Sequence, residues 1–525
     1  MKPIRLDGLS LGRAQLVEVA HGASVELDPN ALRDVARAAD FLAGKVEQGQ
    51  PIYGVSTGFG SNADKLLGGN DASIYAKLQR NLIETHAVCV GEPFAPEVVR
   101  AMLCIRVNTL LRGHSGIRVQ TLQALAAMLN AGVVPVVPQL GSVGASGDLA
   151  PLSHLAIVLI GGGEAFFGGE RMAGGEALRR AGLQPVELTI KEGLALNNGT
   201  AQMLATGVLA LQELEDLLDT ADIAAAMTLD AFAGRLGAYA EEVHALRPHP
   251  GQVHVAARLR ALLAGSTLAD ISYARVRGKK VQPQDSYSLR CVPQVHGAVR
   301  DAVAQAARVL EIELNAVTDN PLVFPEAVDA PLDRQVISAG HFHGMPLALA
   351  MSYVKAAIPV LASISERRLN KLVDPATSDG LPGFLVGNED GTESGFMIVQ
   401  YTAAAIVNDL ASRAMPATVY SIPTSANAED HVSMGANEAR HVLAMVDDLG
   451  KVLALELMTA AQALDLRVRM VEGEAHPGRA VAAAHAAIRE RIAFLDRDRA
   501  LDGDVASALR MVGDGSVLAA ARAAG

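Results

Sequence analysis

The sequence predicts a mainly α-helical protein, with a long central helix bundle and a smaller N-terminal α+β portion. Half of its 525 residues are hydrophobic, while aromatic residues make up 4% and tryptophan is absent. A core built from alanine, leucine and valine with few aromatic side chains is typical of helices packed on helices. Long helical patterns follow one another after residue 200, whereas strand-like segments come before it. We therefore expect three regions, at residues 1–200, 201–470 and 471–525.

The N-terminal region begins with a short strand-like segment and then alternates helices with glycine-rich loops. A helix opens at Asp28 and Pro29, since an aspartate suits the N-cap and a proline suits the first turn. Glycines crowd the segment from Tyr53 to Gly60, which predicts a mobile or tightly bent loop. Residues 161–190 are also rich in glycine and predict a small β-hairpin. Further helices are expected at about residues 72–89, 95–111 and 117–131.

The central region is dominated by long helical patterns, which together predict a bundle. They fall at about residues 200–236, from 251 onward, and at 293–316, 343–371, 396–414 and 429–466. The longest apolar stretch, Met345 to Ile364, is interrupted by Lys355 and Pro359, so we expect a buried core helix and not a membrane span. The alanine-rich tail after Gly473 is expected to pack on the bundle or on a neighbouring subunit.

Composition excludes several classes of function. A net charge of −12 argues against a nucleic-acid or membrane partner. Cys89, Cys104 and Cys291 are too scattered for a disulfide framework or a zinc site. His341 and His343 have no third ligand nearby, so we expect no metal. Because the N-terminus has no apolar leader segment, we expect a soluble, cytoplasmic protein.

The stretch from Gly141 to Leu152, GSVGASGDLAPL, combines a turn of small residues with the start of an apolar helix. Small residues allow backbone bends that larger side chains forbid. We predict a helix from Leu149 to about Ile160, with Asp148 as its N-cap and Pro151 in its first turn. The tripeptide Ala145–Gly147 then lies at the positive end of a helix dipole, which favours negative charge. A capped turn before a buried helix is the purely structural alternative.

This stretch resembles the signature of the aromatic amino-acid ammonia-lyases, which include histidine, phenylalanine and tyrosine lyases and related aminomutases of fumarase/aspartase-like architecture. The resemblance implies that Ala145, Ser146 and Gly147 cyclise with loss of two waters. The product is 4-methylidene-imidazol-5-one (MIO), an electrophile that the chain makes itself, so no external cofactor is expected. The residue types suit this chemistry. The amide nitrogen of Gly147 attacks the carbonyl of Ala145, and Ser146 loses its hydroxyl to become the methylidene.

Other motifs of the same family follow in the same order. Tyr53, in YGxxTGFG, corresponds to the catalytic base, and because tyrosine has an ordinary pKa of about 10, the site has to stabilise its phenolate. Asn198, in KEGLALxNGT, is implied to contact the MIO carbonyl. The motif QDxYSLRC assigns Arg290 to the substrate carboxylate, which a guanidinium fork matches. It gives a supporting catalytic role to Tyr287 and a supporting substrate contact to Gln284.

The resemblance also bears on the substrate. Thr85 and His86 are closest to the Ser-His pair of histidine-specific members, and Phe342 corresponds to an aromatic residue that packs in the site. Asp409 stands where those members have a glutamate that binds imidazole. These residues imply loss of ammonia from L-histidine to give trans-urocanate. Because Asp409 and Ala428 depart from the pattern, the alternative is a tyrosine or phenylalanine ammonia-lyase, with coumarate or cinnamate as product, or a related aminomutase.

Members of this family are homotetramers whose sites are built from three subunits, so we expect a small amino-acid substrate and a homotetramer with shared active sites. Long helices with extended apolar faces agree with this, because such faces need a partner to bury them. An inactive structural protein is an alternative from another class, against which the intact Tyr53, Ser146, Asn198 and Arg290 argue. The fumarase-type lyases are disfavoured because their GSSxMPxKxN loop is absent.

Overall fold

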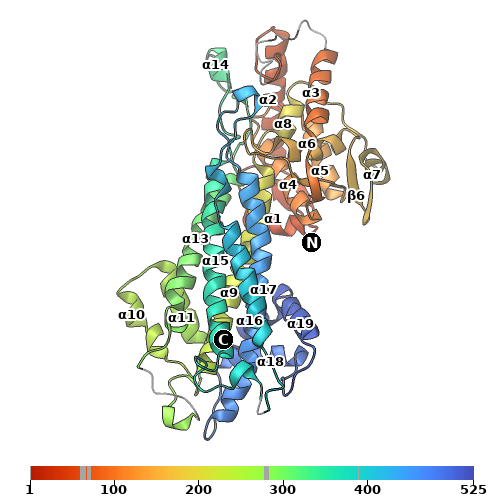
Figure 1. The fold of residues 1–525 in the computed structure, drawn as a ribbon. Coiled ribbons are helices and arrows are strands. Elements are labelled where there is room, and N and C mark those ends of the chain that lie inside the picture. The colour runs from red at the N-terminus through yellow and green to blue at the C-terminus, as the bar shows by residue number, and fades with distance from the viewer. Residues whose placement is uncertain (1, 60–64, 66, 68–71, 277–282, 388–389) are drawn as a thin grey trace. The chain divides into compact units, whose positions relative to one another are not determined.

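A computed structural model describes residues 2–59, 65, 67, 72–276, 283–387 and 390–525. Helices dominate it and the strands are short (Figure 1), which confirms the predicted mainly-α fold class. The chain forms two compact units, each assembled from segments distant in sequence. Unit 1 comprises Met1–Leu209, Ala306–Ser352 and Pro416–His441, and unit 2 comprises Ala210–Gln305, Tyr353–Met415 and Val442–Gly525.

Unit 1 contains short and medium helices, among them α4 (Pro96–Leu110), which packs on α1 and α5 and in which every residue from Ala101 to Leu110 is buried. As predicted, Asp28 caps α2, its carboxylate accepting hydrogen bonds from the backbone amides of Asn30 and Ala31. The helices of this unit are α1 (Arg13–Ala20), α2 (Pro29–Glu47), α3 (Ala72–His86), α4 (Pro96–Leu110), α5 (Val119–Asn130), α6 (Leu149–Leu159), α7 (Gly174–Arg180), α8 (Glu192–Asn197) and α14 (Leu332–Gln335). Helix α6 packs on α3 and α8, which places the expected Ala-Ser-Gly loop beside both.

The strands form small sheets within unit 1. β1 (Ile4–Leu6) pairs in parallel with β2 (Val25–Leu27), and β3 (Val90–Pro93) is antiparallel to β5 (Pro138–Leu140). β4 (Val134–Pro135), β6 (Glu164–Phe167) and β7 (Glu170–Ala173) form an antiparallel sheet in that order. β8 (Leu322–Val323) is antiparallel to β9 (Val336–Ile337). The β6–β7 pair is the hairpin predicted for residues 161–190, and Gly168 and Gly169 close it with positive φ angles.

Four long helices contribute residues to both units: α9 (Ala201–Phe232), α13 (Val292–Glu313), α15 (Met345–Val373) and α17 (Gly435–Met470). Each lies where a long helical pattern is predicted. Because these helices run from one unit into the other, the compact units do not follow the sequence-continuous division at residues 200 and 470.

Unit 2 adds shorter helices to its share of the long ones. These are α10 (Glu241–Ala245), α11 (Pro250–Leu262), α12 (Tyr287–Arg290), α16 (Met397–Arg413), α18 (Arg479–Arg491), α19 (Asp502–Gly513) and α20 (Ser516–Ala524). In the tail, α18 packs on α20 and on α11. The tail therefore completes the packing of unit 2.

A buried polar network joins the four long helices inside unit 2. Arg368 of α15 holds Glu456 of α17 through its Nε and Nη2 atoms, at 2.5 and 2.8 Å. His296 of α13 donates from Nδ1 to Asp222 of α9 at 2.8 Å, and its Nε2 lies 3.3 Å from Arg368 Nη1. Burial lowers the pKa of His296, so its imidazole is neutral at pH 7. Buried charges are costly unless paired, so this network favours one alignment of the four helices.

Helix α15 is long and apolar enough to cross a membrane, and it is the one such helix in the described part of the chain. Most of its apolar window, 61%, is buried inside the protein, and Lys355 within it is fully buried. Both features are those of a core helix.

Candidate active site

The Ala-Ser-Gly loop before α6 is held by a close backbone contact with the segment that joins α8 to α9. Gly147 adopts a left-handed conformation (φ +72°), and a Cβ atom on it would strike the carbonyl of Gly199. The two glycines form a parallel bridge, in which Asp148 N donates to Gly199 O at 2.7 Å and Gly199 N donates to Ser146 O at 3.3 Å. Only glycine at position 147 permits this approach.

Asp148 occupies the predicted N-cap position of α6, but its side chain does not cap that helix. Its carboxylate instead accepts hydrogen bonds from the backbone amides of Gln202 and Met203, both at 3.0 Å, and from Ser142 Oγ at 2.8 Å. Burial raises the pKa of Asp148 to about 6. The carboxylate therefore ties the loop to the first turn of α9, and the expectation of a local cap is corrected.

Two donors converge on the carbonyl oxygen of Ser146. Asn198 Nδ2 lies 3.2 Å from it, and Gly199 N lies 3.3 Å from it. Asn198 is 3% exposed, and its Oδ1 has no hydrogen-bond partner among the described residues. Preorganised donors aimed at one carbonyl oxygen stabilise negative charge that develops there.

A cavity of about 810 Å³ lies over the tripeptide, and all of its lining residues belong to unit 1. It gathers side chains from the Tyr53 loop, from α3 and from the segment before α15. The predicted site residues that line it are Tyr53, Thr85, His86, Ala145, Ser146, Asn198 and Phe342. The structure thus brings together seven residues that were singled out from separate motifs.

The loop carrying Tyr53 is bent tightly enough to hold its tyrosine at this cavity. Gly54 has a φ of +64°, and a Cβ on it would lie 2.7 Å from the ring of Phe59. The Tyr53 ring meets Phe59 edge-on, with centroids 6.5 Å apart. Gln79 Nε2 of α3 donates to the Gly54 carbonyl at 3.1 Å, which fixes the loop on that helix. Gly60, the last residue of the motif, lies outside the described residues.

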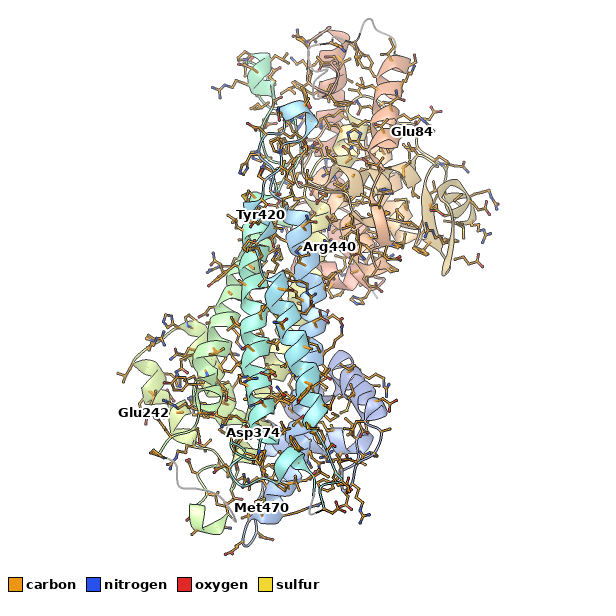
Figure 2. The ribbon with its side chains drawn as sticks, viewed as in Figure 1. Glu84, Glu242, Asp374, Tyr420, Arg440 and Met470 are labelled. Carbon is orange, nitrogen blue, oxygen red and sulfur yellow. The ribbon has the colours of Figure 1, made fainter. Side chains whose placement is uncertain are left out.

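Thr85 and His86 end α3 at the cavity. Thr85 Oγ1 donates to the Asn81 carbonyl at 2.8 Å and lies 3.1 Å from His86 Nδ1. Burial lowers the pKa of His86, and the charge of Glu429 opposes that shift more weakly. The imidazole is therefore neutral at pH 7 and can donate or accept a hydrogen bond. Glu84, the neighbour of Thr85, is exposed on the same helix (Figure 2).

Glu429 is a site residue that the sequence analysis missed. Ser146 Oγ donates to Glu429 Oε1 at 2.9 Å, and Thr424 Oγ1 donates to Oε2 at 2.7 Å. The sequence analysis used this segment only to note that Ala428 departs from the family pattern, although the adjacent carboxylate was the available signal. Other lining residues not singled out for this site include Lys65, Asp430, His343 and His431.

Four predicted site residues belong to unit 2 and do not line this cavity: Gln284, Tyr287, Arg290 and Asp409. Tyr287 is 72% exposed, and the Arg290 guanidinium packs on its ring at 4.7 Å. Asp409 has a side chain 64% exposed and pairs with Arg413 at 2.6 Å. The described lining of the cavity contains no arginine, so unit 1 does not itself supply the expected ligand for a substrate carboxylate.

Comparisons with known proteins agree with this site. The family "Aromatic amino acid lyase" matches residues 11–490. The chain is 49% identical over 517 residues to a histidine ammonia-lyase of Symbiobacterium thermophilum, covering 98% of both chains. Among solved structures, it matches a tyrosine aminomutase from Streptomyces globisporus (TM-score 0.91, 35% identity, 100% and 99% of the two chains). It also matches a histidine ammonia-lyase from Trypanosoma cruzi (TM-score 0.88, 36% identity, 99% and 95%).

Proposed function

The chain belongs to the aromatic amino acid lyase family, and we propose that it is a carbon–nitrogen lyase that eliminates ammonia from L-histidine to give trans-urocanate. The observation that carries the choice of substrate is the cavity over Ser146, because it brings His86 and Glu429 to the tripeptide. Both side chains can hydrogen-bond an imidazole. Similarity to histidine ammonia-lyases over the whole chain supports the same choice.

The proposal includes an MIO group formed from Ala145, Ser146 and Gly147, and their setting fits its formation. Gly147 has no side chain beside the amide nitrogen that attacks the Ala145 carbonyl, and its surroundings leave no room for one. The Ser146 hydroxyl, which has to leave, is bonded to a carboxylate. Once formed, the group supplies an electrophile that accepts electron density from the substrate and makes its amine a leaving group.

Asn198 and Gly199 would stabilise the negative charge that this chemistry places on the Ser146 carbonyl oxygen. After cyclisation, the Ser146 carbonyl oxygen that they contact would be conjugated with the carbon derived from Ser146 Cβ. Donors on that oxygen stabilise negative charge as it arrives, and since they are fixed by the fold they need no reorganisation.

Tyr53 is the proposed base, taking a proton from the β-carbon of the substrate onto its phenolate oxygen. It lines the same cavity as Ser146. Holding the base and the electrophile on one bound substrate supplies much of the remaining rate.

Glu429 is the proposed contact for the substrate imidazole. Its Oε1 atom accepts from the Ser146 hydroxyl, which is lost when the tripeptide cyclises. Oε1 is then left without that donor in a cavity shaped for substrate, while Thr424 still holds Oε2. An imidazole N–H replaces the lost donor, and a phenyl ring cannot.

The proposed carboxylate ligand is Arg290, supplied with Tyr287 and Gln284 by a neighbouring subunit of a homotetramer. The support is that these residues belong to unit 2, outside the lining of the cavity, and that Gln284 and Tyr287 are exposed. Asp409 also belongs to unit 2 and does not line the cavity.

Exposed apolar side chains support assembly, because large apolar residues on a surface mark interfaces. On α15 and α16 they recur at helical spacing, and Tyr420 in unit 1 is 60% exposed (Figure 2). Those on the two helices, each 49–60% exposed, are Leu349, Tyr353, Val360, Ile398 and Tyr401. We propose a soluble, cytoplasmic assembly.

The test is a comparison of kcat/KM for histidine, tyrosine and phenylalanine, following the absorbance of the unsaturated product. Histidine should give the highest value. A higher value for tyrosine or phenylalanine would assign the alternative lyase activity, and a β-amino acid product would assign an aminomutase. No product from any of the three would support an inactive structural role.

A further inference from the structure

Arg106 of α4 is a buried arginine to which the proposed mechanism gives no role. It is 1% exposed, and its Nη1 donates to the Asn198 carbonyl at 2.5 Å. Its Nε and Nη2 atoms have no hydrogen-bond partner within the described residues. Burial lowers the pKa of Arg106 to about 10, so it keeps its proton at neutral pH. A buried charge with two unsatisfied donors is costly, and such a cost calls for a function.

The carbonyl that Arg106 contacts belongs to the same peptide group as the Gly199 N–H. That N–H donates to the Ser146 carbonyl oxygen at 3.3 Å. The guanidinium, the peptide group and the Ser146 carbonyl therefore form one chain of hydrogen bonds. In such a chain each bond polarises the next, and a charged first donor has the largest effect. A Cβ on Gly199 would strike Arg106 Nη1, so the missing side chain also admits the arginine.

The neighbouring charges leave the guanidinium free to act in this way. Lys191 Nζ pairs with Asp319 Oδ2 at 2.8 Å, and both side chains are fully buried. Asp319 acts on Arg106 through space, and across the described ranges no carboxylate forms an ion pair with Arg106. Its recorded hydrogen bond goes to the Asn198 carbonyl oxygen.

We propose that Arg106 is a positioning residue for the lyase reaction: it polarises the Asn198–Gly199 peptide and thereby strengthens the Gly199 N–H that stabilises negative charge on the Ser146 carbonyl oxygen. This inference rests on the proposed function, since it concerns the same carbonyl. The competing explanation is structural. Asn198 is the C-cap of α8, and an arginine can simply satisfy a carbonyl at a helix end. A capping arginine affects stability, whereas a polarising one also affects the electrophile.

The experiment measures the electrophile directly, without turnover. Cyanide is a small nucleophile that adds to an unsaturated carbonyl: its carbon bonds to the methylidene carbon, the π electrons move to the Ser146 carbonyl oxygen, and a proton follows, so the protein gains one HCN. Intact-mass spectrometry gives the rate of this gain for the wild type, Arg106→Gln and Arg106→Lys. Arg100→Gln is the matched control. Arg100 lies on the same helix and donates to the carbonyls of Val19, Ala23 and Leu129, none of them in the site.

Removing a whole oxyanion donor typically costs 100- to 1,000-fold in rate, so weakening one should slow cyanide addition by ~10-fold in Arg106→Gln. The kcat for histidine should fall with it, while KM stays within about twofold. Arg106→Lys, which keeps the charge, should add cyanide within about threefold of wild type, and Arg100→Gln within about twofold, even if each unfolds at a lower temperature.

The inference is overturned if Arg106→Gln has lost its two waters and adds cyanide at the wild-type rate. If Arg106→Gln does not fold or cyclise, Arg106→Lys decides: a ~10-fold slower addition in cyclised Arg106→Lys would contradict a role for the charge. If the wild-type protein has not lost two waters, the proposed function itself is refuted. Failure of the proposed function can therefore be distinguished from failure of the inference about Arg106.

Discussion

Replacing Glu429 with glutamine tests the recognition of the substrate ring. The change keeps the size of the side chain and removes its charge. Glu429 Oε1 accepts from the Ser146 hydroxyl at 2.9 Å, and that donor disappears on cyclisation, which leaves the oxygen to the substrate. A hydrogen bond to a charged group contributes about 1.5–3 kcal/mol. Because 1.4 kcal/mol is tenfold, kcat/KM for histidine should fall about 10- to 150-fold.

The loss should be selective. Phenylalanine has no ring N–H to donate, so its kcat/KM should change by less than about threefold. Glu164→Gln is the matched control, since Glu164 is an exposed carboxylate paired with Arg171 outside this cavity; it should leave both values within about twofold. Intact mass has to show that each variant has lost two waters. Equal losses on histidine and phenylalanine would place Glu429 at the amine common to both substrates, and an unchanged histidine value would remove it from recognition altogether.

The remaining predictions concern the electrophile, the base, the substrate preference and stability. Wild-type protein should be lighter than its encoded mass by two waters, and Ser146→Ala, which has no hydroxyl to lose, should regain one or both and lose nearly all activity; an unshifted mass in active wild type rejects the MIO group. Tyr53→Phe should lower kcat by about 10²–10⁴ with little change in melting temperature, and more than about a tenth of wild-type turnover would mean that another group is the base. Thr85→Phe combined with His86→Leu should reverse the preference from histidine to phenylalanine in kcat/KM, since it replaces polar partners with apolar surface; an unreversed order would remove the pair from substrate selection. Burial lowers the pKa of His296 below 6.5 in the folded protein, so the contribution of neutral His296 to stability is complete above pH 6.5 and is lost as the pH falls through its folded-state pKa. Between about pH 7 and 5, the urea midpoint of unfolding should therefore fall less steeply in His296→Gln than in the wild type. Equal slopes for the two proteins would contradict this.

Much of the fold can be predicted from short sequence patterns. The cap at Asp28 and the hairpin at Gly168 and Gly169 are where the sequence predicts them, because each depends on residues within a few positions. Asp148 shows the limit of such reasoning. As an aspartate before an apolar helix it predicts a local cap, yet its carboxylate accepts hydrogen bonds from the first backbone amides of α9. Nothing in the spacing of a single helix indicates that distant partner.

The site was predictable to the extent that its chemistry lies in short motifs. The cavity gathers Tyr53, His86 and Asn198 from three such motifs. Glu429 escaped notice because its partner, Ser146, is 283 positions away. Arg106 escaped for a similar reason, although an arginine in the middle of an apolar helix was itself a signal. A contact between distant segments depends on how whole elements pack, and single-sequence patterns carry little information on that.

The contact between Gly147 and Gly199 determines when, during synthesis and folding, the MIO group can form. Until the chain has been synthesised past Gly199 and has folded back on the loop, Ser146 has neither of the two donors that hold its carbonyl. An unfolded or half-made chain would then carry an ordinary serine at that position, inert toward the thiols and amines of the cell. Under the proposed function, the MIO group forms only after the Gly147 and Gly199 segments have folded together. A mass lower by two waters therefore reports that this contact has formed in the molecule.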